Sequence, residues 1–131
     1  MASSSPPHSV LVVDDEVLVR MDLADTMQEA GFHIYEAGSA DEAIRIMEAH
    51  PGIGALFTDI AMPGSMDGLK LAHYVRDRWP PTRIVVASGH TECGADVLPR
   101  GALFIAKPFR QSDLTRAMQA IGADTGPGGR S

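Results

Sequence analysis

Residues Ala55 to Gly64, ALFTDIAMPG, carry the clearest structural signal in the chain. A short apolar run ends in one carboxylate, Asp59, and a turn of proline and glycine follows directly. A run of this length between turn signals is typical of a buried parallel strand. Asp59 then lies where the strand leaves the sheet, at the edge where open α/β sheets bind their ligands. An aspartate also begins many turns, so this residue alone does not distinguish a functional site from a turn.

Working outward from this stretch, strand-like runs alternate with helical runs along the rest of the chain. Further strands are expected at residues 9–13, 33–37, 84–87 and 102–106. Helices are expected at residues 16–30, from the capping box at 39–42 to residue 50, between Asp67-Gly68 and Pro80-Pro81, and around residues 114–121. This alternation predicts a parallel sheet with helices on both of its faces.

Two of the helical segments carry more specific expectations. In the first helix the apolar residues that recur at helical spacing, and that we expect to face the core, are Val17, Met21, Ala24 and Met27. Residues 91–101, between the fourth and fifth strands, contain Gly94, Pro99 and Gly101 and have little helical periodicity. We therefore expect the fourth helix to be short or frayed.

The length and the composition indicate one folded domain with loose ends. At 131 residues the chain is long enough to bury a substantial core. Residues 1–8 are rich in serine and proline and are expected to be a disordered tail. The folded domain is expected to cover residues 9–122, and residues 123–131 are expected to form a flexible glycine-rich tail.

The charge and the cysteine count argue against several classes of protein. The formal net charge of −6 disfavours nucleic acid or an anionic membrane as a direct partner. A single cysteine, Cys93, excludes an intrachain disulfide or a cysteine-based zinc site. The sequence shows neither a secretory signal nor an apolar run of transmembrane length, so we expect no membrane insertion and a cytoplasmic location.

Four of the five expected strands end in polar residues that could share one site. These residues are Asp14 with Asp15, then Asp59, Ser88 and Lys107. We expect a flavodoxin-like, doubly wound α/β fold with five parallel strands in the order 2-1-3-4-5, in which the first and third strands are neighbours. The three carboxylates should then converge, and such a cluster of hard oxygen ligands suits Mg²⁺.

The remaining polar groups indicate phosphoryl transfer. Asp59 stands alone at its strand end and is the natural nucleophile for a covalent acyl phosphate. Lys107 could neutralise a phosphoryl oxygen, and the Ser88 hydroxyl could donate to another. Taken singly, each residue has a simpler interpretation: Asp14 or Asp15 as a helix N-cap, Ser88 as a turn residue, and Lys107 as an exposed cation. These simpler interpretations do not readily explain why polar residues of this kind occur at the ends of four expected strands.

The chain resembles the receiver domain of response regulators in two-component signalling, and within that family the stand-alone receivers of alphaproteobacteria. The matching segments span nearly the whole folded part and are Val12-Val13-Asp14-Asp15-Glu16, Thr58-Asp59-Ile60-Ala61-Met62-Pro63, Met66-Asp67-Gly68, Ala87-Ser88-Gly89 and Lys107-Pro108-Phe109. Two departures are an extra residue at Gly64-Ser65 and a shortened stretch from Ser88 to Lys107. The shortening argues against the usual dimer surface built on the fourth helix.

The resemblance implies a role for each matching residue. Asp59 is the phosphoacceptor, and Mg²⁺ is held by Asp14, Asp15, Asp59 and the backbone carbonyl of Ala61. Ser88 and Lys107 contact the phosphoryl group. Ser88 and Phe104 form the switch, although a phenylalanine inside an apolar strand is also an ordinary core residue.

The resemblance also implies a single receiver domain that acts without an output domain on the same chain. A histidine kinase or phosphotransfer protein donates the phosphoryl group, and the protein changes its binding of an unknown downstream protein or serves as a phosphate sink. It is not an enzyme beyond its own phosphorylation and slow autodephosphorylation, and it is a monomer or a weak phosphorylation-dependent dimer.

Two other functions have to be weighed. A magnesium-dependent phosphatase of the haloacid dehalogenase type also uses an aspartate nucleophile, but places it on the first strand with a second aspartate two residues later, where this chain has Glu16. A nucleotide-binding flavodoxin-like protein needs a glycine-rich or hydroxyl-rich loop after the first strand. Two aspartates in that loop would repel phosphates.

Overall fold

The computed structural model describes residues 9–60, 67–89 and 97–125, with side chains up to residue 120. Along the described chain the elements are β1 (Ser9–Val13), α1 (Val17–Glu29), β2 (His33–Ala37), α2 (Ala40–Ala49), β3 (Ala55–Asp59), α3 (Gly68–Arg78), β4 (Arg83–Ser88), β5 (Leu103–Ala106) and α4 (Gln111–Thr125). The strands form one sheet in the order β2-β1-β3-β4-β5, and every neighbouring pair is parallel. The predicted strand order is confirmed.

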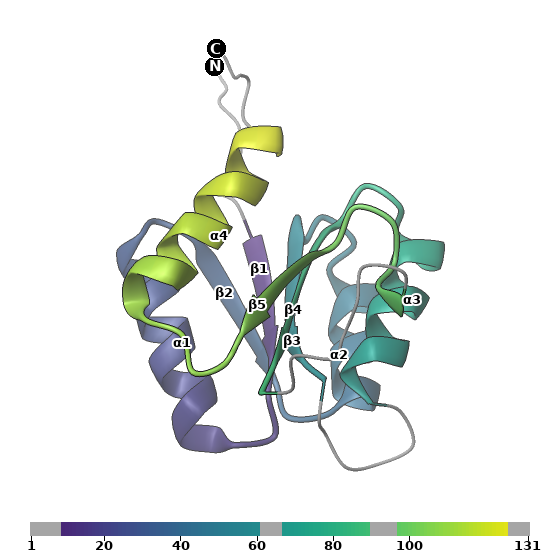
Figure 1. The fold of residues 1–131 in the computed structure, drawn as a ribbon. Coiled ribbons are helices and arrows are strands. Elements are labelled where there is room, and N and C mark those ends of the chain that lie inside the picture. Colours follow the sequence, from purple (N-terminus) through teal and green to yellow (C-terminus); the bar gives the residue numbers. More distant parts are fainter. Residues whose placement is uncertain (1–8, 61–66, 90–96, 126–131) are drawn as a thin grey trace.

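In the described part of the chain, α2 and α3 cover one face of the sheet, and α1 and α4 cover the other (Figure 1). Successive residues of a strand point to opposite faces, so a strand covered on both sides is apolar along its whole length. Leu56 and Ile84 pack in the core beneath α2 and α3. Phe57 and Val85 pack in the second core beneath α1 and α4. Both faces are therefore closed to ligands, which leaves the ends of the sheet for a functional site.

The structure confirms Ala24 and Met27 on the buried side of α1 and corrects the other two predicted positions. Val17 and Met21 are 53% and 50% exposed, whereas Leu23 and Met27 are buried against the sheet. Leu18 is 80% exposed. The helix carries apolar residues on almost every side, so helical spacing alone fits two different faces, and contact with the sheet selects the one containing Leu23. A surplus apolar patch, formed by Val17, Leu18 and Met21, remains on the surface of α1.

Side-chain caps set the start of two helices. Ser39 is the N-cap of α2 and accepts a hydrogen bond from the Glu42 N–H at 3.2 Å, as the predicted capping box requires. The Glu42 side chain accepts from the Gly38 N–H at 2.8 Å, so the return bond of the box goes to the residue before the N-cap. Asp67 caps α3 by accepting from the Lys70 N–H at 2.9 Å. Within the described ranges, no helix combines the length and the apolar character that crossing a membrane requires.

The chain after β4 differs most from the sequence-based expectations. β5 is the edge strand, as the predicted strand order requires, and Leu103 on it is 36% exposed. Residues 90–96 of the expected short helix lie outside the described residues, and residues 97–101 contain no α-helix. The last helix continues to Thr125, past residue 122, because the first strong helix breakers after it are Gly126 and Pro127.

Candidate functional site

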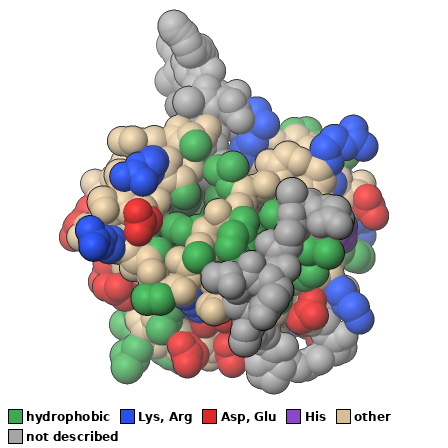
Figure 2. Space-filling model, in the orientation of Figure 1, with side chains coloured by type: hydrophobic (Ala, Val, Ile, Leu, Met, Phe, Trp, Pro, Cys, Tyr) green, Lys and Arg blue, Asp and Glu red, His purple; other side chains and the backbone are tan. Residues whose placement is uncertain are grey.

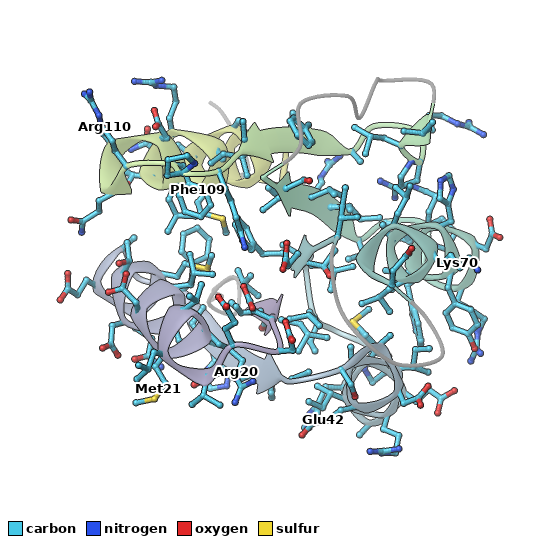
Figure 3. The ribbon with its side chains drawn as sticks, turned by 60° about the horizontal axis from the view of Figure 1, so that its bottom comes forward. Arg20, Met21, Glu42, Lys70, Phe109 and Arg110 are labelled. Carbon is cyan, nitrogen blue, oxygen red and sulfur yellow. The ribbon has the colours of Figure 1, made fainter. Side chains whose placement is uncertain are left out.

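The register of the sheet brings the polar strand ends to one place. Asp59 pairs with Ala87 across β3 and β4, and Ser88 pairs with Ala106 across β4 and β5. The Lys107 N–H continues this ladder by donating to the Ser88 carbonyl oxygen at 2.8 Å. The residues that end or follow these strands therefore emerge at the same end of the sheet, which faces the viewer in Figure 3.

Three carboxylates meet at this end of the sheet. One oxygen from each of Asp14, Asp15 and Asp59 lies within 4.8 Å of the other two. Asp14 is 1% exposed and Asp59 is 9% exposed, while Asp15 is open to solvent. Burying carboxylates this close together is unfavourable unless cations offset their charge. The three aspartates therefore lie together, as the sequence predicted.

Lys107 supplies one positive charge to the cluster. Its Nζ lies 3.3 Å from Asp59 Oδ1 and 3.6 Å from Asp14 Oδ2. One ammonium facing three carboxylates leaves a local excess of two negative charges. Hard oxygen ligands with that excess charge and with one open side fit a divalent cation such as Mg²⁺.

Asp14 is held by bonds on both its side chain and its backbone. Its Oδ1 accepts from the Glu16 N–H at 2.9 Å, and its own N–H donates to the Ala37 carbonyl oxygen at 3.1 Å. The N-cap of α1 is Glu16, so Asp14 precedes the helix and the N-cap interpretation of Asp14 does not apply. The second carboxylate oxygen of Asp14 faces Lys107.

Arg20 is a supporting residue that the sequence analysis did not identify. Its Nη1 donates to the Asp14 carbonyl oxygen at 2.8 Å, and its Nε contacts Glu36 Oε1 at 3.2 Å. It thereby ties α1 to the end of β1 and to β2, and it lies nearer to the strands than its neighbour Met21 does (Figure 3). The available signal was an arginine in the first turns of the helix that follows the acidic pair, but its carboxylate partner, Glu36, is 16 residues away in sequence.

Gly68 was also overlooked as a determinant of the site. Its N–H donates to the Ile60 carbonyl oxygen at 2.9 Å, so the first turn of α3 touches the chain just beyond β3. A Cβ at this position would overlap the Asp59 carbonyl oxygen and would lie 2.6 Å from the Asp59 carbonyl carbon. Only glycine permits this approach, and the contact fixes the backbone that carries the Asp59 side chain.

The other predicted site residues are placed as follows. Ser88 is buried at the end of β4, at 3% exposure. Phe104 is half-buried on β5, opposite Val86, and among the described residues it belongs to neither core. Ala61 lies outside the described residues.

A cavity of about 550 Å³ adjoins the acidic cluster between α1 and the turn after β5. Lys107, Pro108 and Phe109 form one wall, and Val19 and Leu23 of α1 contribute to the other. The site is therefore open on the side of α1, where a donor of a phosphoryl group could approach.

Comparisons with known proteins give the same family throughout. Residues 10–119 match the model of the response regulator receiver domain. The transcriptional regulatory protein PdtaR of Mycobacterium tuberculosis is 34% identical over 122 residues, which are 90% of this chain and 58% of PdtaR, so the chain spans less than two thirds of that relative.

Two solved structures are also similar. The response regulator receiver protein of Sinorhizobium medicae has a TM-score of 0.80 at 28% identity, covering 87% of this chain and 93% of that one. A chain of the CheX–CheY–BeF₃–Mg²⁺ complex of Borrelia burgdorferi has a TM-score of 0.79 at 29% identity, covering 88% and 89%. These matches agree with the fold and the site: the five strands are parallel, and an acidic cluster lies at their ends. The chain belongs to the response regulator receiver domain family of two-component systems.

Proposed function

We propose that this receiver domain accepts a phosphoryl group on Asp59 from a histidine kinase or phosphotransfer protein. The observation that carries the proposal is the place of Asp59: it ends the central strand, inside the acidic cluster, with Lys107 Nζ 3.3 Å from its Oδ1. Labelling by acetyl phosphate is the direct test, and its decisive variant, Asp59→Asn, is treated in the Discussion. The family match favours this function over the phosphatase alternative.

The chemistry needs an ionised carboxylate held in line with the donor. A carboxylate oxygen of Asp59 forms the new bond to phosphorus while the bond from phosphorus to the donor's nitrogen breaks, which yields an acyl phosphate. The Lys107 ammonium offsets negative charge on the transferred group. The Ser88 hydroxyl moves to donate a hydrogen bond to a phosphoryl oxygen. Phe104, on the neighbouring strand, follows this movement of Ser88 and is the switch residue.

We further propose that Asp14, Asp15 and Asp59 hold Mg²⁺, together with the backbone carbonyl of Ala61. The donor set of three carboxylate oxygens supports this assignment. The similar chain from Borrelia burgdorferi belongs to a complex that contains Mg²⁺ and BeF₃. When bound, the ion would neutralise charge on both the carboxylates and the incoming phosphoryl group.

Magnesium should raise the thermal stability of the unphosphorylated protein. A ligand that binds only the folded state, at about ten times its Kd, adds about 1.4 kcal/mol. Asp14→Asn should reduce this shift and should raise the melting temperature without metal, because one of three mutually repelling carboxylates becomes neutral. Thermal melts with and without millimolar Mg²⁺ measure both effects. Asp25→Asn, at an exposed position on α1, is the matched control. An equal magnesium shift in the Asp14 and Asp25 variants would contradict the ligand assignment.

The donor protein is proposed to dock on α1. A phosphohistidine must approach Asp59 closely, so its protein has to cover the surface around the ends of β1 and β3. The surplus apolar patch of Val17, Leu18 and Met21 lies directly after the acidic pair in sequence. Figure 2 shows hydrophobic side chains interspersed with acidic ones over the lower part of α1. Exposed apolar side chains beside a reactive centre are suited to anchoring a partner.

Leu18→Ser should therefore slow protein-to-protein transfer without affecting the chemistry. Leu18 is 80% exposed, so stability should change by no more than about 0.5 kcal/mol. We expect a roughly tenfold loss in the rate of transfer from the histidine kinase or phosphotransfer protein that labels the wild type fastest. Labelling by acetyl phosphate should be unchanged. Val97→Ser, at an apolar position that is 43% exposed, is the control. A loss of the same size with both donors would contradict docking at Leu18.

The proposed output is altered binding of a downstream protein, or competition for phosphate as a sink, by a monomer or a weak phosphorylation-dependent dimer. A pull-down with and without acetyl phosphate distinguishes the two outputs, because only the first requires a protein whose capture depends on Asp59. Light scattering under the same two conditions reports the oligomeric state.

A further inference from the structure

A second pocket lies at the end of the sheet opposite Asp59. Its volume is about 470 Å³, and it is lined by Arg76, Asp77, Pro80, Arg83, Arg100 and Gly101. Arg83 is the first residue of β4 and Ser88 is the last. At about 3.3 Å per residue, the strand separates the two by roughly 16 Å. The pocket is therefore separate from the acidic cluster.

Arg76 builds the wall of this pocket with two of its three guanidinium nitrogens. Its Nε donates to the Arg100 carbonyl oxygen at 2.9 Å, and its Nη1 donates to the carbonyl oxygens of Pro80 and Thr82 at 2.6 Å and 2.9 Å. These bonds join the end of α3 to the turns before β4 and β5. Nη2 makes no hydrogen bond to the part of the chain that the structure describes. It lies on the Gly101 side of the pocket, 3.7 Å from where a Cβ on that residue would be.

Three arginine side chains bring positive charge to the pocket. Among the described residues, no carboxylate oxygen lies within 4.0 Å of a guanidinium nitrogen of Arg76 or Arg100. Burial lowers the pKa of Arg76, and the charges of Arg83 and Arg100 lower it further. Asp77 is the one acidic residue that the described part of the chain contributes to the lining. The positive charges of Arg83 and Arg100 thus act on Arg76 at this pocket, in a chain whose net charge is −6.

We propose that this arginine pocket binds a compact oxyanion that carries two or more negative charges on phosphate or carboxylate groups. The planar guanidinium fork matches both groups through paired N–H donors, which an ammonium cannot do. The volume lies within the range of small-molecule sites. Among the described residues, no aromatic ring lines the pocket, so a stacked base or ring is not part of the expected ligand. The charge of the ligand, rather than an apolar body, is what these residues recognise.

The inference goes beyond the proposed phosphoryl transfer and does not depend on it. The arginine pocket and the acidic cluster have no residue in common. The two sites lie farther apart than one Debye length in physiological salt, which is about 8 Å. An anion in the arginine pocket should therefore have little electrostatic effect on the acidic cluster. Failure of one assignment therefore leaves the other intact, and a residue-resolved measurement can tell them apart.

The test is an NMR titration of the full-length, ¹⁵N-labelled protein in magnesium-free buffer. The probes are inorganic phosphate, pyrophosphate and citrate. We expect saturable shifts of the amides of Arg100, Gly101 and Ala102 with pyrophosphate or citrate, and weaker binding of inorganic phosphate because it carries fewer charges. Binding should weaken as sodium chloride is added. A preference for pyrophosphate over citrate assigns phosphate groups to the ligand, and the reverse assigns carboxylates.

Three variants make the test specific. Arg100→Gln should weaken binding about tenfold, equivalent to about 1.4 kcal/mol. This variant keeps the fold because Arg76 bonds only the backbone oxygen of residue 100. Asp77→Asn should tighten binding severalfold by removing the one opposing charge. Arg45→Gln, at an exposed site on α2, makes the same change in net charge as Arg100→Gln and should have no effect.

Two results would overturn the proposal. One is shifts that fail to saturate, or that appear only at Asp14, Asp59 and Lys107. The other is equal loss of affinity in Arg100→Gln and Arg45→Gln, which would show attraction to overall charge and no built site.

Discussion

Replacing Asp59 with asparagine is expected to abolish labelling of the protein by acetyl phosphate, with a loss of roughly a thousandfold or more in rate. The amide has almost the same shape as the carboxylate but carries no charge and is a poor nucleophile. Asp14 and Asp15 cannot replace it, because Asp14 is held by the Glu16 N–H and Lys107, and Asp15 lies on the solvent side of the cluster. Intact-protein mass spectrometry, followed by peptide mapping, measures the label and its position.

The matched control is again Asp25→Asn, which makes the same chemical change at an exposed position on α1. It should label as fast as the wild type. Labelling of Asp59→Asn at the wild-type rate, with the phosphate mapped to another residue, would show that the phosphoacceptor has been misassigned. Circular dichroism of both variants should match the wild type, so that lost labelling reports chemistry and not unfolding.

Gly68→Ala is expected to have the largest effect on stability, about 3 kcal/mol or more. The added methyl group would meet the backbone of Asp59 and Ile60, and backbone cannot rotate away as a flexible side chain can. Either α3 or the end of β3 has to move, which breaks the hydrogen bond from Gly68 to Ile60. For a chain of this size the loss corresponds to a fall in melting temperature of about 10 °C or more. Thermal and urea melts give both quantities.

Gly52→Ala provides the comparison for this substitution. Nothing lies within 4 Å of a Cβ at position 52, and its φ angle is not in the left-handed region. Alanine there should be neutral or slightly stabilising, because it restricts the unfolded chain. Gly68→Ala should also slow labelling of the remaining folded protein, since the shifted backbone carries Asp59. Equal melting temperatures for the two variants would disprove the close approach.

The sequence contained enough information for the sheet and for much of the acidic cluster. Strand runs and turn residues are local signals, and the parallel order follows from their alternation with helices, so Asp14, Asp59 and Lys107 could be brought together without coordinates. The buried face of α1 was predicted only in part: Ala24 and Met27 are buried as expected, but helical spacing alone did not exclude Val17 and Met21, and only contact with the sheet selects Leu23 in their place. The same limit applies to Arg20, because its carboxylate partner Glu36 lies on another element, β2.

Gly68 illustrates a different limit. The sequence showed this residue as part of a motif. Glycine is required at this position because the backbones of α3 and β3 approach each other closely, and that distance depends on how the two elements pack. β5 is apolar throughout, yet its place at the sheet edge leaves Leu103 36% exposed. Local patterns identify elements, whereas distances between elements come only from the folded structure.

The bonds of Arg76 have a consequence for how this sequence can diverge. All three acceptors are backbone carbonyl oxygens, at positions 80, 82 and 100. Every residue type carries such an oxygen, so these three positions can accept many side chains without loosening the joint between α3 and the turns. Arg76 itself has no such freedom, because lysine offers one point charge where a planar fork is needed. The joint should therefore tolerate few substitutions of Arg76 and many at positions 80, 82 and 100.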